Sequence, residues 1–194
     1  MHSIVRRVTF FGLLLPLAVS AQQRKPLGAQ LRVRWDGFKI VVIKDGVKHP
    51  FSLDKDVMVY AFDSVKLLSA KSGGDFTYLL FDIKGRSRGP ESAESYCGAG
   101  EERSLIWVKL DAVWKKVDTQ SFVIESCFDT ASLDDEGAPI TFSGQDLVAR
   151  GTTNRDPKKE GTIADRKLMQ YEVGYSIKHP ENGLHINLIP VEHK

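Results

Sequence analysis

The sequence lacks the short motifs that identify several large classes of enzyme. It has no His-Glu-x-x-His pair of a zinc peptidase and no glycine-rich loop followed by Lys-Ser/Thr that would cradle a phosphate. We also expect no nucleophile elbow of the α/β-hydrolase type. Gly98-Ala99-Gly100 lacks the third glycine and the following helix of a dinucleotide-binding loop, so we interpret it as a turn. We therefore assign no catalytic and no cofactor-binding residue, and a non-enzyme is favoured.

Residues at the spacing of metal ligands are also scarce. The four histidines after residue 21 are not placed as a chelating set, because His179 and His185 point to opposite faces of a predicted hairpin. Four acids between residues 129 and 136 lack the alternation that surrounds a calcium ion with oxygens, so we interpret them as a solvated loop. The sequence predicts no metal site and no cofactor.

The sequence has one long hydrophobic run, and it lies at the N-terminus. Arg6 and Arg7 precede an apolar segment at residues 8–19, and Val19-Ser20-Ala21 supplies small residues for a cleavage site. This is the three-part pattern of a secretory signal peptide, with Gln22 as the first mature residue. About a dozen apolar residues are too few for the ~20 of a membrane helix. We therefore expect residues 1–21 to be removed and the mature protein to be exported, to the periplasm or the medium, without a membrane span.

The chain without residues 1–21 has a formal net charge of zero. The whole chain has 27 Lys+Arg and 25 Asp+Glu, and residues 1–21 contain two arginines and no acid, which leaves 25 of each sign. A neutral protein of this size gives no global reason to expect nucleic acid as a partner.

Cysteine is limited to Cys97 and Cys127. Export favours a disulfide between them, because oxidising compartments preserve such bonds. A predicted hairpin centred near Trp114 places Cys127 opposite about residue 102, within a few residues of Cys97. A metal-binding or catalytic thiol is the less favoured alternative, since no further cysteine or histidine stands at ligand spacing.

Short apolar and alternating segments separated by turns predict an all-β chain. Residues 57–62, 65–70, 76–83, 105–110 and 122–127 have strand character, and 76–83 and 105–110 are apolar on both faces, as in central strands. No window has the period of a long amphipathic helix. We expect residues 22–194 to form one antiparallel β-sandwich or barrel of about ten short strands.

Turn dipeptides set the expected register at the two ends of the domain. Asp36-Gly37 and Asp45-Gly46 predict a three-stranded meander in which Val33 faces Ile40 and Val42 faces His49. The outer face then carries the basic residues, including Arg34 directly opposite Lys39. Near the C-terminus, Asn182-Gly183 predicts a tight hairpin in which Ile177 faces Leu188.

Two surfaces are candidate partner-binding sites. The first is the outer meander face, where the basic residues surround Val41 and Ile43; the second is a polar loop expected at residues 84–103, where Tyr96 offers an aromatic anchor. The alternatives are a covered sheet face with snorkelling lysines and a merely solvated loop. The candidate partner-binding residues are Arg32, Arg34, Lys39, Lys48, Arg86, Arg88 and Tyr96.

Three function hypotheses follow. The first is an exported, non-enzymatic binding module, such as an inhibitor or accessory protein of the cell envelope. Its partner would be an envelope or extracellular protein, or an anionic glycan. The second is a hydrolase of envelope or extracellular polysaccharide with scattered carboxylates, although Glu101 and Glu102 point apart in an extended chain. The third is a structural envelope subunit that assembles through its sheet edges. A sandwich fold does not decide among them.

Overall fold

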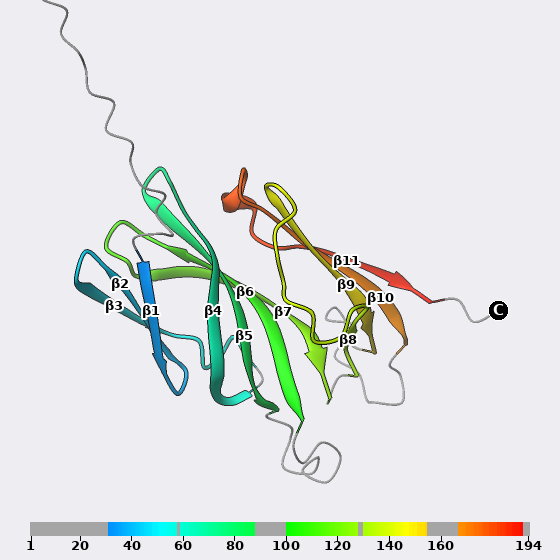
Figure 1. Cartoon of the computed structure of the whole chain (residues 1–194). Helices are drawn as coiled ribbons and strands as arrows, with labels where there is room; N and C mark the ends of the chain where they lie inside the picture. Colours follow the sequence, from blue (N-terminus) through cyan, green and yellow to red (C-terminus); the bar gives the residue numbers. More distant parts are fainter. Residues whose placement is uncertain (1–30, 58, 88–99, 128–129, 155–166, 192–194) are drawn as a thin grey trace, which may run out of the picture.

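The computed structural model describes residues 31–57, 59–87, 100–127, 130–154 and 167–191, and these are almost entirely β-structure. Three open antiparallel sheets are stacked as layers, with the four-stranded sheet β4–β7 in the middle (Figure 1). The predicted all-β class is therefore confirmed, and the arrangement is a layered sandwich without a closed barrel. In the described part of the chain, no helix is long and apolar enough to cross a membrane.

The first sheet has the order β1-β2-β3, the middle sheet β4-β5-β6-β7 and the third β11-β10-β9-β8. The strands are β1 (Leu31–Asp36), β2 (Lys39–Lys44), β3 (Val47–Ser52), β4 (Val59–Gly73), β5 (Phe76–Ser87), β6 (Glu101–Leu110), β7 (Lys116–Ser126), β8 (Ser132–Leu133), β9 (Asp146–Thr153), β10 (Met169–Ser176) and β11 (His185–Pro190). A 3₁₀ turn, η4 (Pro180–Asn182), precedes β11.

The middle sheet is buried on both faces, as its uninterrupted apolar sequence predicts. One face of β5 and β6 packs against the meander through residues such as Phe81 and Ile106. The opposite face packs against the third sheet through residues such as Leu80 and Trp107. Trp107 also donates a 2.9 Å hydrogen bond from Nε1 to the carbonyl of Pro180, which ties η4 to the middle layer.

The meander forms with its faces sorted as predicted. In the β2–β3 hairpin Val42 pairs with His49, so this register is confirmed. The β1–β2 register is two residues away from the prediction, because the turn is formed by Gly37 and Phe38 instead of Asp36 and Gly37; Val33 therefore pairs with Val42. A shift of two preserves the side-chain alternation, so the apolar face still points to the core.

The C-terminal hairpin differs more from its prediction. Tyr171 pairs with Leu188, so the register differs by six residues from the tight turn expected at Asn182-Gly183. The strands are joined by a wide connection that contains η4, and Gly183 adopts a positive φ of 71°. An even shift again keeps the apolar residues on the inner face.

Two predicted boundaries in the middle sheet are wrong. The strands expected at 57–62 and 65–70 are one long strand, β4, with register irregularities that bend it without ending it. The loop expected at 84–103 is shorter, since β5 continues to Ser87 and β6 begins at Glu101.

Candidate functional site

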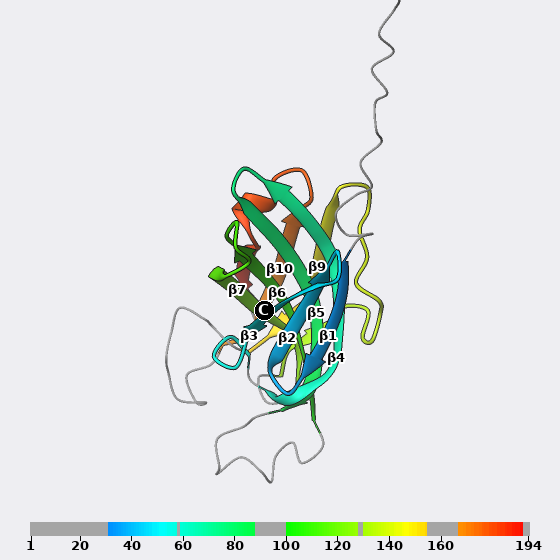
Figure 2. The ribbon, with the colours of Figure 1, turned by 90° about the vertical axis from the view of Figure 1, so that its left-hand side faces the viewer.

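The outer face of the meander is the candidate site, and its residues lie in three cross-strand rows. Figure 2 views the meander in front of the middle sheet. The first row is Arg32–Ile43–Lys48, the second Arg34–Val41–Pro50 and the third Asp36–Lys39–Ser52. Neighbouring strands are ~4.8 Å apart, so each row crosses the sheet in about 10 Å. The four cations thus surround a short apolar strip.

One predicted contact on this face is wrong. Arg34 does not stand opposite Lys39: it pairs with Val41, and Lys39 pairs with Asp36 across the strands. The difference follows from the turn at Gly37-Phe38, which moves the β1 partners by two residues. The face therefore avoids a like-charge pair directly across two strands, which is destabilising in a sheet.

The four cations are exposed and carry no ion pair among the described residues. Arg32, Arg34, Lys39 and Lys48 are all exposed, and none is within 4 Å of a described carboxylate. Val41 and Ile43 between them are half-buried. In the described part of the chain no further sheet lies over this face (Figures 1 and 2).

The second candidate surface lies largely outside the described residues. Arg88, Tyr96 and Cys97 fall there, so their roles stay predictions. Arg86 is on β5, exposed, and pairs in register with Glu101. Of the candidate residues on this second surface, only Arg86 is described, and no described contact joins it to the meander cations.

The predicted disulfide stays a prediction for the same reason. Glu102 pairs with Ser126, so Cys127 follows one step beyond the position predicted to face residue 102. The hairpin that would bring the two cysteines together is thus confirmed, while Cys97 itself is outside the described residues.

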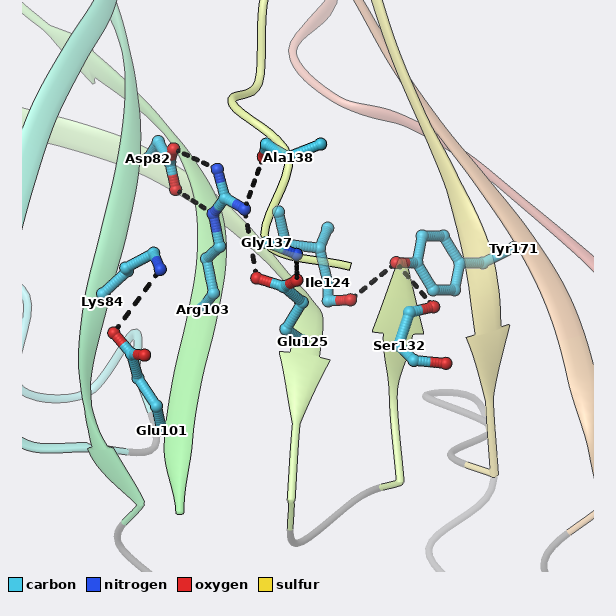
Figure 3. Close-up of polar contacts among 10 residues, drawn as sticks. All are labelled: Asp82, Lys84, Glu101, Arg103, Ile124, Glu125, Ser132, Gly137, Ala138 and Tyr171. Atoms are coloured by element: carbon cyan, nitrogen blue, oxygen red, sulfur yellow. Dashed lines mark hydrogen bonds and ion pairs between the residues drawn. The ribbon is translucent and has the colours of Figure 1, made fainter. Parts of the chain in front are cut away.

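The structure also contains a buried ionic cluster around Arg103, which was not predicted from the sequence. Arg103, on β6, donates from Nε and Nη2 to both carboxylate oxygens of Asp82 at 2.8 Å (Figure 3). Its Nη1 donates to Glu125 at 3.1 Å and to the carbonyl of Ala138 at 2.9 Å. The arginine side chain is 4% exposed. Hydrogen bonds to Asp82 are the largest cause that raises the pKa of the guanidinium above its usual value.

The cluster lines a cavity of about 350 Å³ at one end of the middle sheet. Its charges already satisfy one another: Glu125 also accepts from the Gly137 amide at 2.8 Å, and Lys84 lies 3.6 Å from Glu101 (Figure 3). A cavity whose charged groups are mostly paired offers little to a charged ligand. We therefore interpret the cluster as a structural element.

Tyr171 adds a neutral hydrogen bond beside the cluster. Its hydroxyl donates to the carbonyl of Ile124 at 2.6 Å, which joins β10 of the third sheet to β7 of the middle sheet (Figure 3). Burial is the main cause that raises the pKa of this phenol, and the nearby charge of Glu125 adds to it. The hydroxyl therefore remains protonated well into the alkaline range.

Residues 85–89 have the Gly-x-Ser-x-Gly spacing of the hydrolase elbow, so only their structural context argues against one. An elbow requires a sharp turn from a strand into a helix, whereas Ser87 ends β5 and donates its hydroxyl to Glu102. The glycine at position 85 is explained by packing, because a Cβ there would lie 2.2 Å from the carbonyl oxygen of Ala61. Arg88 and Gly89 are outside the described residues.

Comparison with known proteins adds no assignment. No family model matches the chain, and no match was found among curated proteins or among solved structures. The function is therefore inferred from the geometry of the surfaces described above.

Proposed function

We propose that the protein is a non-enzymatic binding module whose meander face takes an acidic partner. The observation that supports this is the set of four exposed cations around Val41 and Ile43, none of which has a described carboxylate within 4 Å, although Asp36 lies opposite Lys39 on the same face. Exposed, unpaired charges steer an oppositely charged partner and set its orientation. The apolar strip between them adds surface that a partner can bury.

The partner class is an envelope or extracellular protein with an acidic patch, or an anionic glycan. The face is one side of a three-stranded sheet and lines neither of the described cavities, so it suits an extended ligand better than a small molecule. Arg32 and Arg34 present planar guanidinium groups on one edge strand, which favours bidentate recognition of carboxylates.

Export and the disulfide are part of the same proposal. The N-terminal pattern supports removal of residues 1–21 and an exported protein, such as an envelope inhibitor or accessory factor. A bond between Cys97 and Cys127 would close a loop that the chain-entropy treatment credits with roughly 3.5–4 kcal/mol. The hydrolase hypothesis remains an alternative; Glu101 is exposed and Glu102 is buried, in agreement with carboxylates that point apart.

The test compares two double variants with equal changes in charge. Arg32→Glu/Arg34→Glu removes the cations of β1, and Lys167→Glu/Lys178→Glu changes two exposed lysines that flank β10 in the opposite layer. Binding to immobilised polyglutamate and polygalacturonate, measured against salt concentration, serves as the readout. We expect the β1 variant to bind at least about tenfold more weakly and the control within about twofold of the unmodified protein.

Two results would contradict the proposal. Equal weakening by both variants would mean that net charge, and not this face, attracts polyanions. Absence of binding by the unmodified protein at low salt would exclude both probe classes. A preference for one probe would separate an acidic polypeptide partner from a glycan.

A further inference from the structure

The free edge of the third sheet, β11, is a second interaction surface and is independent of the proposed function. In the described part of the chain β11 is hydrogen-bonded to β10 only. Its sequence, His-Ile-Asn-Leu-Ile-Pro, contains no Lys, Arg, Asp or Glu. Ile186 is 38% exposed and Ile189 is 51% exposed. An uncharged, exposed edge strand is a template for pairing with another chain.

The other sheet edges in the described structure are covered or protected. β1 is tied to β4, because Trp35 donates from Nε1 to the carbonyl of Phe62 at 3.1 Å. β3 carries Lys48 and Pro50. β4 is irregular along its length, and β7 and β8 are joined to each other by a bridge between their ends. Charges, prolines, bulges and coverage are the usual devices against edge pairing, and β11 has only the proline at its end.

The backbone of β11 presents a defined set of groups that have no partner among the described residues. Val191 donates its amide to the carbonyl of Leu168 at 3.1 Å, which fixes where the β10–β11 ladder is hydrogen-bonded. Because bonded and non-bonded pairs alternate in an antiparallel ladder, His185, Asn187 and Ile189 bond toward β10. Ile186 and Leu188 therefore direct both their amide and their carbonyl away from the sheet.

We propose that β11 pairs antiparallel with β11 of a second copy, around a two-fold axis that passes between the two Asn187 residues. Ile186 of each copy then faces Leu188 of the other, and the outward groups of these residues form four hydrogen bonds. The inner-face side chains of Ile186 and Leu188 extend the apolar layer across the axis. The pattern is complementary to itself, which is the requirement for a two-fold contact.

The absence of charge is what selects a second copy as the occupant. A charged residue at position 187 would meet its own copy across the axis, at a cost, whereas the neutral Asn187 meets itself without one. A foreign strand would find no charge there to set its register. Six residues form a contact smaller than a standard interface of ~1,600 Å², so the dimer is expected to be weak and to depend on concentration.

The test places a charge at the two-fold axis. Asn187 is exposed on the outer face, and its pair across the axis is a second Asn187, so Asn187→Lys opposes two lysines in the dimer. Gln170→Lys is the matched control, because Gln170 is exposed on the same face of β10, where both positions neighbour Glu172. Sedimentation equilibrium of the protein from low micromolar to millimolar concentration gives the dissociation constant.

We expect Asn187→Lys and Asn187→Glu each to weaken the dimer at least about tenfold, and Gln170→Lys to leave it unchanged. An equimolar mixture of Asn187→Lys with Asn187→Glu should dimerise again, because opposite charges then meet at the axis. A protein that stays monomeric throughout, or a dimer insensitive to Asn187→Lys, would overturn the proposal. A mixture of Asn187→Lys and Asn187→Glu that does not dimerise would also overturn it, because the two position-187 side chains would then not meet at a two-fold axis.

Discussion

Arg103 and Arg34 both lie on strands, yet the charge of Arg103 is buried among acids and that of Arg34 is exposed to solvent. Arg103 is 4% exposed and its guanidinium contacts two carboxylates and a backbone carbonyl. Arg34 is exposed, pairs across the sheet with Val41 and has no ion-pair partner among the described residues. The buried guanidinium of Arg103 is held by its partners, whereas the guanidinium of Arg34 contacts solvent.

The cost of desolvation explains the difference. A charge taken out of water is costly unless its partners supply strong hydrogen bonds in return. Asp82 and Glu125 provide them for Arg103, and the three strands β5, β6 and β7 are thereby joined through their side chains. On the meander face Arg32 and Arg34 are exposed, so no such cost arises there, and no contact among the described residues requires either position to be basic.

Removing the buried charge should give the largest effect. Arg103→Met keeps the length of the side chain but leaves the buried carboxylate of Asp82 without its partner and the half-buried Glu125 with only the Gly137 amide, so we expect a loss of about 3–5 kcal/mol in the free energy of unfolding. Urea denaturation followed by circular dichroism measures it. Arg150→Met is the control, since its pair with Glu172 is well exposed and should contribute less than ~1 kcal/mol. Equal losses in the two variants would refute a structural role specific to Arg103.

Tyr171 should show a smaller effect with a distinct pH signature. Tyr171→Phe removes the hydrogen bond to Ile124, so we expect a loss of about 1 kcal/mol at neutral pH. Because burial raises the pKa of the folded phenol, the unfolded chain ionises first as pH rises above ~10, and stability contributed by the protonated phenol is lost there.

The variant should therefore lose stability less steeply in this range. The expected difference in slope is at most ~1.4 kcal/mol per pH unit, the value for one proton. Urea unfolding in buffers between neutral and strongly alkaline pH provides the measurement. Tyr175 is also buried with a raised pKa, so Tyr175→Phe tests whether the two tyrosines contribute separately. Identical slopes for the unmodified protein and Tyr171→Phe would contradict the assignment.

Alternation predicted most of the strands and their faces, but it missed β9, divided β4 into two strands and could not place the turns. Both register differences, at Gly37 and near Gly183, are even numbers of residues, so burial was preserved while the partners changed. Which residues form a turn depends on how the strands meet the neighbouring sheet. Phe38, for example, lies in the turn and packs against the core beside Phe62.

The Arg103 cluster could have been suspected from two interruptions of pattern. Asp82 lies within an apolar run of β5, and Arg103 precedes the apolar run of β6. A charge inside a strand buried on both faces needs a partner of opposite sign. Glu125 lies directly opposite Arg103 in the predicted β6–β7 hairpin, so this partner was within reach of the sequence, whereas the carbonyl of Ala138 comes from the segment after β8, whose position depends on the packing of the third sheet.

The Arg32→Glu/Arg34→Glu variant, for which we expect the largest loss of binding, should show the smallest change in stability. Arg32→Glu/Arg34→Glu changes two exposed side chains that have no ion-pair partner among the described residues, so the free energy of unfolding should stay within about 0.5 kcal/mol of the unmodified protein. The same urea titration used for Arg103→Met measures it on one scale. A loss of several kcal/mol would show that these arginines stabilise the fold, and any accompanying loss of polyanion binding would then have a structural cause. An unchanged urea midpoint together with weakened polyanion binding would show that Arg32 and Arg34 act in binding and not in stability. Arg103 would then differ from them in its measured role, as it differs from them in burial.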